Sequence, residues 1–203
     1  MDRNIAKLLD DYKNHALDRR YFLKALAILA GGTAAVTVLP VWLENNRAEA
    51  ELISEEDPSL KSEFTMYPGT AGEMKAYWSC SKDAEKSPGV VVVHENRGLN
   101  PHIRDVARRL AREGFLALAP DALSSLGGTP DDQAKAVAMI KTLDPAQTLG
   151  NFVAAVKYLD SNPLCTGQVG VVGFCWGGAM ANQLAVHCPE LDAAVPYYGL
   201  QPK

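Results

Sequence analysis

The sequence lacks the cysteine and histidine spacing of a metal site. Its four cysteines and four histidines are scattered over 203 residues without a C-x-x-C pair or a Cys/His ligand cluster, so we expect no zinc. An excess of positive charge is missing too. The net charge of −4 gives no reason to expect nucleic-acid binding. Internal repeats and low-complexity tracts are absent as well. Hydrophobic residues make up 47% and charged residues 22%, which indicates a globular domain with a substantial core.

The first 50 residues have the pattern of an export signal. Arg19 and Arg20 precede Phe-Leu-Lys and a mildly apolar run at 25–43, an order typical of a twin-arginine (Tat) signal. The alternative is a membrane anchor, because the run is nearly long enough to span a bilayer. Residues 48–50, Ala-Glu-Ala, form a small-x-small cleavage site. We therefore expect a leader at 1–50 that the Tat export machinery recognises, and a protein that is periplasmic or held at the membrane through that leader alone.

An acidic linker is expected at 51–61, and a domain at 62–203 in which strand and helix patterns alternate. Strands are predicted at 63–67, 74–80, 90–93, 115–119, 168–172 and 193–198, and helices at 101–114, 131–142, 146–160 and 179–187. The first two strands read as a hairpin. The continuous apolar run at 90–93 suits a strand that is buried on both faces. The alternation indicates an α/β fold, a mostly parallel sheet with helices on both faces.

The strongest chemical signal is the hexapeptide at 173–178, Gly-Phe-Cys-Trp-Gly-Gly, which joins a strand to a helix. The G-x-S-x-G nucleophile elbow has the same construction, and here cysteine takes the central place. Gly173 and Gly177 are required because strand and helix backbones approach closely. The amino end of the helix favours a thiolate and a developing oxyanion. We predict that Cys175 is a nucleophile. The alternative, a buried structural cysteine, is our interpretation of the other three: Cys80, Cys165 and Cys188.

Four stretches together resemble the dienelactone hydrolases, α/β-hydrolases that are also called carboxymethylenebutenolidases. They are HENRGLN at 94–100, ALAPD at 117–121, GFCWGG at 173–178 and PYYG at 196–199. The resemblance covers residues from about 60 to 203, and the leader resembles that of an exported branch. It implies a hydrolase with an α/β-hydrolase fold. Such an enzyme attacks small-molecule esters or enol lactones through a cysteine nucleophile and an acyl-thioester, without a metal or organic cofactor.

The resemblance gives Glu95 a role beside the nucleophile. Glu95 follows the predicted strand at 90–93, so its carboxylate is expected at the carboxyl edge of the sheet together with Cys175. It would accept the hydrogen bond or the proton of the resting thiol and help to generate the thiolate when substrate binds. The alternative is an ordinary carboxylate at a strand end, paired with Arg97 or Arg104.

The oxyanion hole is predicted from two backbone positions. The N–H groups of Trp176, directly after the nucleophile, and of Asn96, in the loop after the first parallel strand, would bind the oxyanion. The side chain of Trp176 would wall the pocket or simply pack. Arg97 would bind a substrate carboxylate with its planar fork, or else form an ion pair with Glu95 or Asp121.

The sequence after Cys175 lacks a suitable general base. In α/β-hydrolases the acid and the histidine follow the nucleophile in the chain. The residues that follow here contain one histidine and two acids: His187, Glu190 and Asp192. His187 is about 18 Å along the helix from Cys175, too far to serve. We interpret His94 and His102, the histidines expected near the carboxyl edge of the sheet, as structural or surface residues, and the alternative is a replacement base. The C-terminal strands and helices of the fold are therefore expected to be missing, and the alternative function is a truncated or degenerate noncatalytic fragment.

Overall fold

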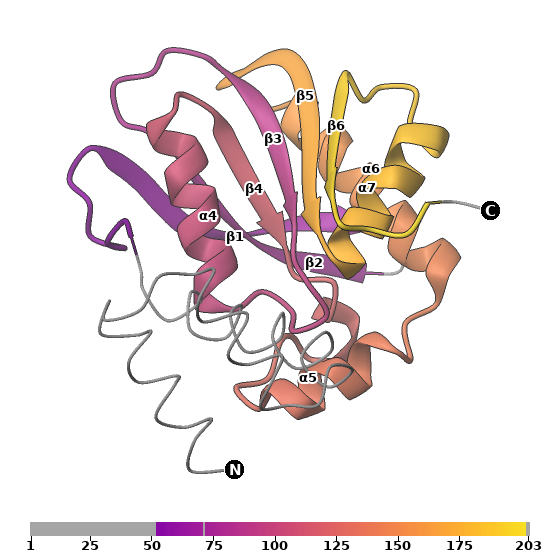
Figure 1. Ribbon diagram of the computed structural model, residues 1–203. Helices are drawn as coiled ribbons and strands as arrows, with labels where there is room; N and C mark the ends of the chain where they lie inside the picture. Colours follow the sequence, from indigo (N-terminus) through magenta and orange to yellow (C-terminus); the bar gives the residue numbers. More distant parts are fainter. Residues whose placement is uncertain (1–51, 71, 202–203) are drawn as a thin grey trace, which may run out of the picture. The chain divides into compact units, whose positions relative to one another are not determined.

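The computed structural model describes residues 52–70 and 72–201 (Figure 1). Its elements are β1 (Leu60–Gly69), β2 (Gly72–Ser81), β3 (Ser87–Val93), α4 (Pro101–Arg112), β4 (Leu116–Pro120), the 3₁₀ turn η1 (Ser124–Leu126), α5 (Gln133–Ile140), α6 (Pro145–Asp160), β5 (Cys165–Phe174), α7 (Trp176–His187) and β6 (Ala193–Tyr197). Every predicted strand and helix is present. The twin arginines, the apolar run and the cleavage site lie outside the described residues. Within the described ranges, no helix is long and apolar enough to cross a membrane.

The strands form one six-stranded sheet in the order β1-β2-β4-β3-β5-β6. β1 and β2 form the predicted antiparallel hairpin, and β2 also runs antiparallel to β4. β4, β3, β5 and β6 are parallel to one another. The prediction of a mostly parallel α/β sheet is confirmed.

Helices cover both faces of this sheet (Figure 1). On one face α4 packs through Ile103 and Ala107 against buried strand residues such as Val92. On the other face α6 and α7 enclose the larger core, which contains Phe152 and Leu184. The central strands β3 and β4 are buried on both faces, and this explains their nearly continuous apolar sequences.

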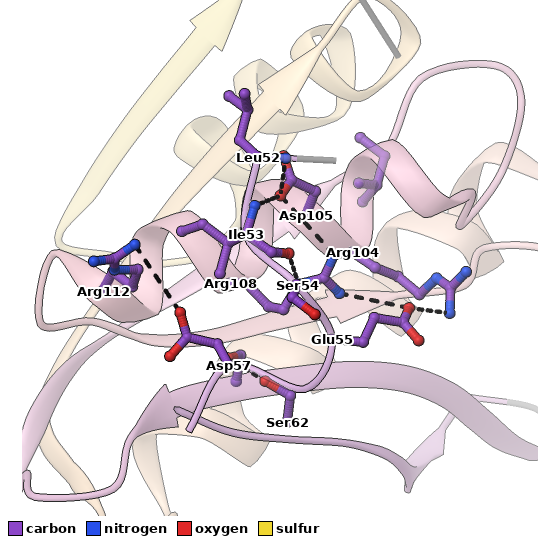
Figure 2. A network of polar contacts seen from close by, with 12 residues as sticks. Leu52, Ile53, Ser54, Glu55, Asp57, Ser62, Arg104, Asp105, Arg108 and Arg112 are labelled. Carbon is purple, nitrogen blue, oxygen red and sulfur yellow. Dashed lines mark hydrogen bonds and ion pairs between the residues drawn. The ribbon is translucent and has the colours of Figure 1, made fainter. Parts of the chain in front are cut away.

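The stretch at 52–57, within the predicted linker, lies along α4 (Figure 2). The backbone N–H groups of Leu52 and Ile53 donate to the Asp105 carboxylate at 3.1 and 2.8 Å. The Arg108 Nε group donates to the Ile53 carbonyl at 2.7 Å. The start of the described chain is therefore hydrogen-bonded to a helix of the domain. The division of the chain at residues 50 and 61 stays a prediction.

An open groove of about 660 Å³ lies between α4 and the β5–β6 end of the sheet. Apolar side chains of both sides line it, among them Val106, Leu110, Val172 and Phe174. The bordering strand β6 is largely exposed: Val195 and Tyr197 retain 47% and 50% of their accessible surface. In the described part of the chain, β6 pairs only with β5 and so forms an edge of the sheet.

Candidate active site

Cys175 occupies a sharp turn between β5 and α7. Its backbone angles are φ 55° and ψ −112°, a left-handed conformation that a non-glycine residue adopts only when its surroundings impose it. Two hydrogen bonds hold the turn. The Cys175 N–H group donates to the Tyr197 carbonyl at 3.0 Å, and the Ala179 N–H group donates to the Cys175 carbonyl at 3.1 Å. The residue is half-buried, and the turn has the geometry of the predicted nucleophile elbow.

The glycines around Cys175 allow backbones to touch. A Cβ atom on Gly173 would collide with the Gly177 carbonyl, and one on Gly177 would collide with the carbonyls of Val93 and His94. The first turn of α7 therefore rests directly on the backbone where β3 ends. This confirms the reason given for glycine at 173 and 177.

The strand register brings the candidate residues to one edge of the sheet. β3 and β5 are parallel neighbours in which Val93 is paired with Gly173. Glu95 and Cys175 each follow that pair by two residues, so both emerge at the carboxyl edge. Their assignment as catalytic groups stays a prediction.

Glu95 is buried, with 8% of its surface exposed, and its carboxylate accepts a hydrogen bond from the Tyr198 hydroxyl at 3.1 Å. The alternative partners do not hold it. Arg104 pairs with Glu55 at 2.6 Å, and no ion pair joins Glu95 to Arg97 within residues 52–70 and 72–201. Sequence reasoning did not single out Tyr198, although the PYYG stretch that contains it carried part of the family resemblance.

His94 is fully buried, and both of its ring nitrogens are used. Nδ1 lies 2.6 Å from the Glu95 carbonyl, and Nε2 accepts a hydrogen bond from the Ala122 N–H group at 3.1 Å. The proton therefore resides on Nδ1, which donates to the carbonyl. Burial lowers the pKa of His94 below its usual 6.5, although the nearby backbone and Asp121 oppose this shift. The interpretation of His94 as structural is confirmed.

The Trp176 ring packs between two other rings. It is stacked on His94 with ring centroids 5.4 Å apart, and it meets Phe152 edge-on at 6.3 Å. Its side chain is thus a packing element. Its backbone N–H group belongs to the first turn of α7, where N–H groups have no acceptor within the helix. This is the group that the predicted oxyanion hole requires.

A buried aspartate braces the 94–100 loop, which carries Asn96. The Asp121 carboxylate accepts hydrogen bonds from the Thr129 backbone N–H at 2.7 Å and from its hydroxyl at 2.8 Å. The Thr129 hydroxyl oxygen in turn accepts the Leu99 N–H at 2.8 Å. Sequence reasoning missed Thr129, because its contact with Leu99 spans 30 residues. Asp121 is therefore engaged with Thr129, and no ion pair with the half-buried Arg97 occurs among the described residues.

The acids and the histidine that follow Cys175 lie at the wrong end of the domain. His187 is the last residue of α7, whereas Cys175 directly precedes the first residue, so the two lie at opposite ends of the helix. The Asp192 carboxylate accepts the Val169 N–H at 2.7 Å, in the first half of β5, and Glu190 pairs with Lys157 at 3.3 Å. The prediction that His187 cannot serve the elbow is confirmed. His102 lines the groove beside α4.

Comparison with known proteins decides the family. The model of the dienelactone hydrolase family matches residues 74–203, more than half of the chain. This chain belongs to the dienelactone hydrolase family. The family predicted from the sequence is therefore confirmed, and so is its α/β-hydrolase fold.

Three relatives show how much of this chain, and how much of each relative, the similarity covers. A protein of Escherichia coli (strain K12) named "Putative hydrolase fragment YghX" is 46% identical over 106 residues, which cover 51% of this chain and 91% of that protein. The "Putative carboxymethylenebutenolidase" of the same strain is 34% identical over 153 residues, 73% of this chain and 56% of that protein. A solved "Putative Dienelactone Hydrolase" from Klebsiella pneumoniae superposes with a TM-score of 0.64 at 32% identity, over 71% of this chain and 62% of that one. The chain thus spans less than two thirds of the carboxymethylenebutenolidase and of the solved relative.

Proposed function

We propose that this protein is a hydrolase of small-molecule esters or enol lactones that uses Cys175 as its nucleophile. The observation that carries the proposal is the position of Cys175, at a left-handed elbow directly before the amino end of α7. A helix amino terminus lowers the pKa of a thiol and stabilises the thiolate. The family membership supports the same reaction class.

The proposed reaction begins with a proton transfer. The S–H bond of Cys175 breaks, the proton moves to the Glu95 carboxylate, and the thiolate attacks the carbonyl carbon of the substrate. The backbone N–H groups of Trp176 and Asn96 stabilise the oxyanion that forms. The ester C–O bond then breaks, and the leaving alkoxide or enolate takes up the proton held by Glu95. The acyl-thioester that remains reacts with water to give the acid and to regenerate the Cys175 thiol. A thiolate is itself a good leaving group, so substrates with good leaving groups such as enol lactones fit best.

Arg97 is proposed to bind a carboxylate of the substrate. It is half-buried in the same loop as Asn96, and the two carboxylates that could compete for it have other partners, because Glu95 accepts from Tyr198 and Asp121 accepts from Thr129. A guanidinium fork matches a carboxylate in a bidentate arrangement.

The orienting acid and the histidine are proposed to come from polypeptide equivalent to the part of the relatives that this chain does not span. Among the described histidines, His94 uses both ring nitrogens within the fold, and His187 ends α7 far from the elbow. Export by the Tat machinery through the leader is likewise proposed, because the twin arginines, the apolar run and the cleavage site occur in the right order.

Acylation by p-nitrophenyl acetate tests the nucleophile. We expect one acetyl group per chain, located on Cys175 by peptide mass spectrometry. Little further turnover is expected, because His94 uses both ring nitrogens within the fold and His187 lies at the far end of α7. Cys175→Ala should abolish the acetylation. The matched controls are Cys80→Ala and Cys188→Ala, because burial raises the pKa of both thiols and should leave them unreactive.

Two results would contradict the proposal. One is acetylation that persists at the same rate in Cys175→Ala, and the other is a folded wild-type protein whose Cys175 stays unmodified. Multiple turnover that is lost in Cys175→Ala would leave the nucleophile in place and disprove the proposed outside origin of the acid and the histidine.

A further inference from the structure

Asn96 and Arg97 are the two central residues of a turn that follows β3. The turn is closed by a long hydrogen bond, in which the Gly98 N–H group donates to the Glu95 carbonyl at 3.4 Å. The Asn96 N–H group takes no part in this bond and makes no hydrogen bond to another described residue. It can therefore donate to a substrate oxyanion, provided that contacts outside the turn hold it in place.

The loop at 121–129, which follows β4, contacts both ends of this turn. At the start of the turn, His94 donates to the first carbonyl at 2.6 Å and accepts the Ala122 N–H at 3.1 Å. At its end, the Thr129 side chain touches Gly98 so closely that a Cβ atom on the glycine would collide with it. The neighbouring loop therefore sets where the turn lies.

The Thr129 hydroxyl joins the end of the turn to a buried carboxylate. It donates to Asp121 Oδ1 at 2.8 Å and accepts the Leu99 N–H at 2.8 Å. Asp121 also accepts the backbone N–H groups of Thr129 and Leu123, at 2.7 and 3.0 Å. A hydroxyl has one proton, so a hydroxyl that donates to a carboxylate can only accept from its other partner. Asp121 thus orients the hydroxyl to hold Leu99, and the charged acceptor strengthens the chain of bonds.

We propose that Thr129 is a positioning residue that keeps the Asn96 N–H group in the oxyanion hole, with its hydroxyl oriented by Asp121. The inference rests on the proposed function of Cys175.

Two reactions of the Cys175 thiolate separate this role from general support of the fold. Attack on an ester forms an S–C bond and moves an electron pair of the C=O bond to oxygen, where an N–H donor must lie about 3 Å away. Alkylation by iodoacetamide forms an S–C bond, breaks the C–I bond and releases iodide, and no oxyanion is created. Both reactions need the thiolate, but only the first needs a well-placed Asn96.

The rates of Cys175 acetylation by p-nitrophenyl acetate and of its alkylation by iodoacetamide, measured at one pH on the full-length protein, test the proposal. Thr129→Val keeps the shape of the side chain and removes its hydroxyl. It should acetylate about tenfold more slowly than wild type, because complete removal of an oxyanion donor costs about 10²–10³-fold and here the donor is only displaced. Its alkylation rate should not change. Thr129→Ser retains the hydroxyl and should restore the acetylation rate.

Thr148→Val is the matched control. The buried Thr148 hydroxyl donates to the Asp144 carbonyl at 2.6 Å at the start of α6, so this substitution also removes a hydroxyl hydrogen bond, and it should leave both rates unchanged. Thr129→Ala is a second variant without the hydroxyl and should show the same selective loss of acetylation. Near-ultraviolet circular dichroism confirms that each variant is folded.

Three outcomes would overturn the inference: Thr129→Val that acetylates at the wild-type rate, an equal slowing of acetylation and alkylation, or Thr129→Ser that is as slow as Thr129→Val. Failure of the proposed function is seen separately, as the absence of selective Cys175 acetylation in the wild type, and it would remove this inference as well. Selective acetylation of the wild type combined with any of the three outcomes removes the role of Thr129 alone.

Discussion

His94 shows how a single buried side chain makes stability depend on pH. It is held in its neutral form by burial, with one nitrogen donating to the Glu95 carbonyl and the other accepting from Ala122. Its pKa in the folded state lies below the usual 6.5. As pH falls through 6.5, the unfolded chain binds a proton at this site that the folded protein does not bind. Acid therefore reduces the contribution of His94 to the free energy of unfolding.

We expect the difference in free energy of unfolding between wild type and His94→Gln to become smaller as pH falls. Near neutral pH the substitution should cost about 1–3 kcal/mol, because two buried hydrogen-bonding groups lose their partner. Below pH 6.5 protonation of His94 stabilises the unfolded wild type, and the variant has no such group. The free energy of unfolding of the wild type therefore falls towards that of the variant. Urea unfolding over a pH series measures this. His187→Gln, at the exposed end of α7, is the control, and parallel curves for His94→Gln and wild type would contradict the argument.

At the scale of single residues, prediction from sequence was uneven for a physical reason. The turn around Cys175 was predictable because its glycines and its nucleophile are neighbours in the chain. The hydrogen bond from Tyr198 to Glu95 was not, because it joins two loops that only the sheet brings together. The neutral tautomer of His94 likewise depends on Ala122, 28 residues away.

At the scale of elements, the attachment of residues 52–57 to α4 depends on Arg108. This side chain is fully buried, donates to the Ile53 carbonyl and to the Tyr77 hydroxyl, and lies 3.9 Å from the Asp105 carboxylate. Figure 2 shows the segment crossing the helix at this network. A buried cation is tolerated only when such partners surround it.

We expect Arg108→Leu to lower the free energy of unfolding by about 3 kcal/mol, because it leaves the buried Asp105 carboxylate without its cation. The segment at 52–57 should also become a site of limited proteolysis. Urea unfolding and mass spectrometry of the cleavage products measure the two effects. Arg112→Leu is the matched control. Its pair with Asp57, 4.0 Å long, is half-exposed on the arginine side, and little change is expected. Equal effects of both substitutions would contradict a special role of Arg108.

The boundaries of elements followed the sequence closely, because most of them are set locally. Asn100, Asp132 and Asp144 cap the three helices before α7 with their side chains, and a proline starts two of these helices. The stretch at 52–57 was harder to interpret. Its acidic composition is typical of a linker, and only the arginines of α4 show why it is hydrogen-bonded to the domain.

At the scale of the whole molecule, the β6 edge and the adjoining groove are unusually exposed apolar surfaces. Val195, Tyr197 and Leu200 are 47%, 50% and 83% exposed. An edge strand with unpaired backbone groups and apolar side chains is a template for association with another chain. The opposite edge strand, β1, also exposes apolar side chains, since Phe64 and Met66 are 48% and 51% exposed, although α4 and α6 contact that strand.

We therefore expect concentration-dependent self-association of the purified protein, visible by sedimentation velocity. Val195→Lys should weaken it, because a charge on the edge strand disfavours strand pairing. Val186→Lys is the control, since Val186 is 63% exposed on the helix α7 and belongs to no strand of the sheet. A protein that stays monomeric at all concentrations would contradict the expectation, as would equal effects of the two substitutions.

The sequence by itself determined what depends on neighbours in the chain: the strand and helix pattern, the glycine-flanked elbow around Cys175, and the motifs that identify the dienelactone hydrolase family. The glycines of a tight turn and the spacing of apolar residues in a helix or strand involve residues that are close in the sequence. They can therefore be recognised without knowledge of the fold. Only the tertiary structure decided which distant groups meet: Glu95 with Tyr198, His94 with Ala122, and residues 52–57 with α4. These contacts follow from strand order and register, and a hydrogen bond that depends on ångström-scale placement leaves no local pattern in the sequence.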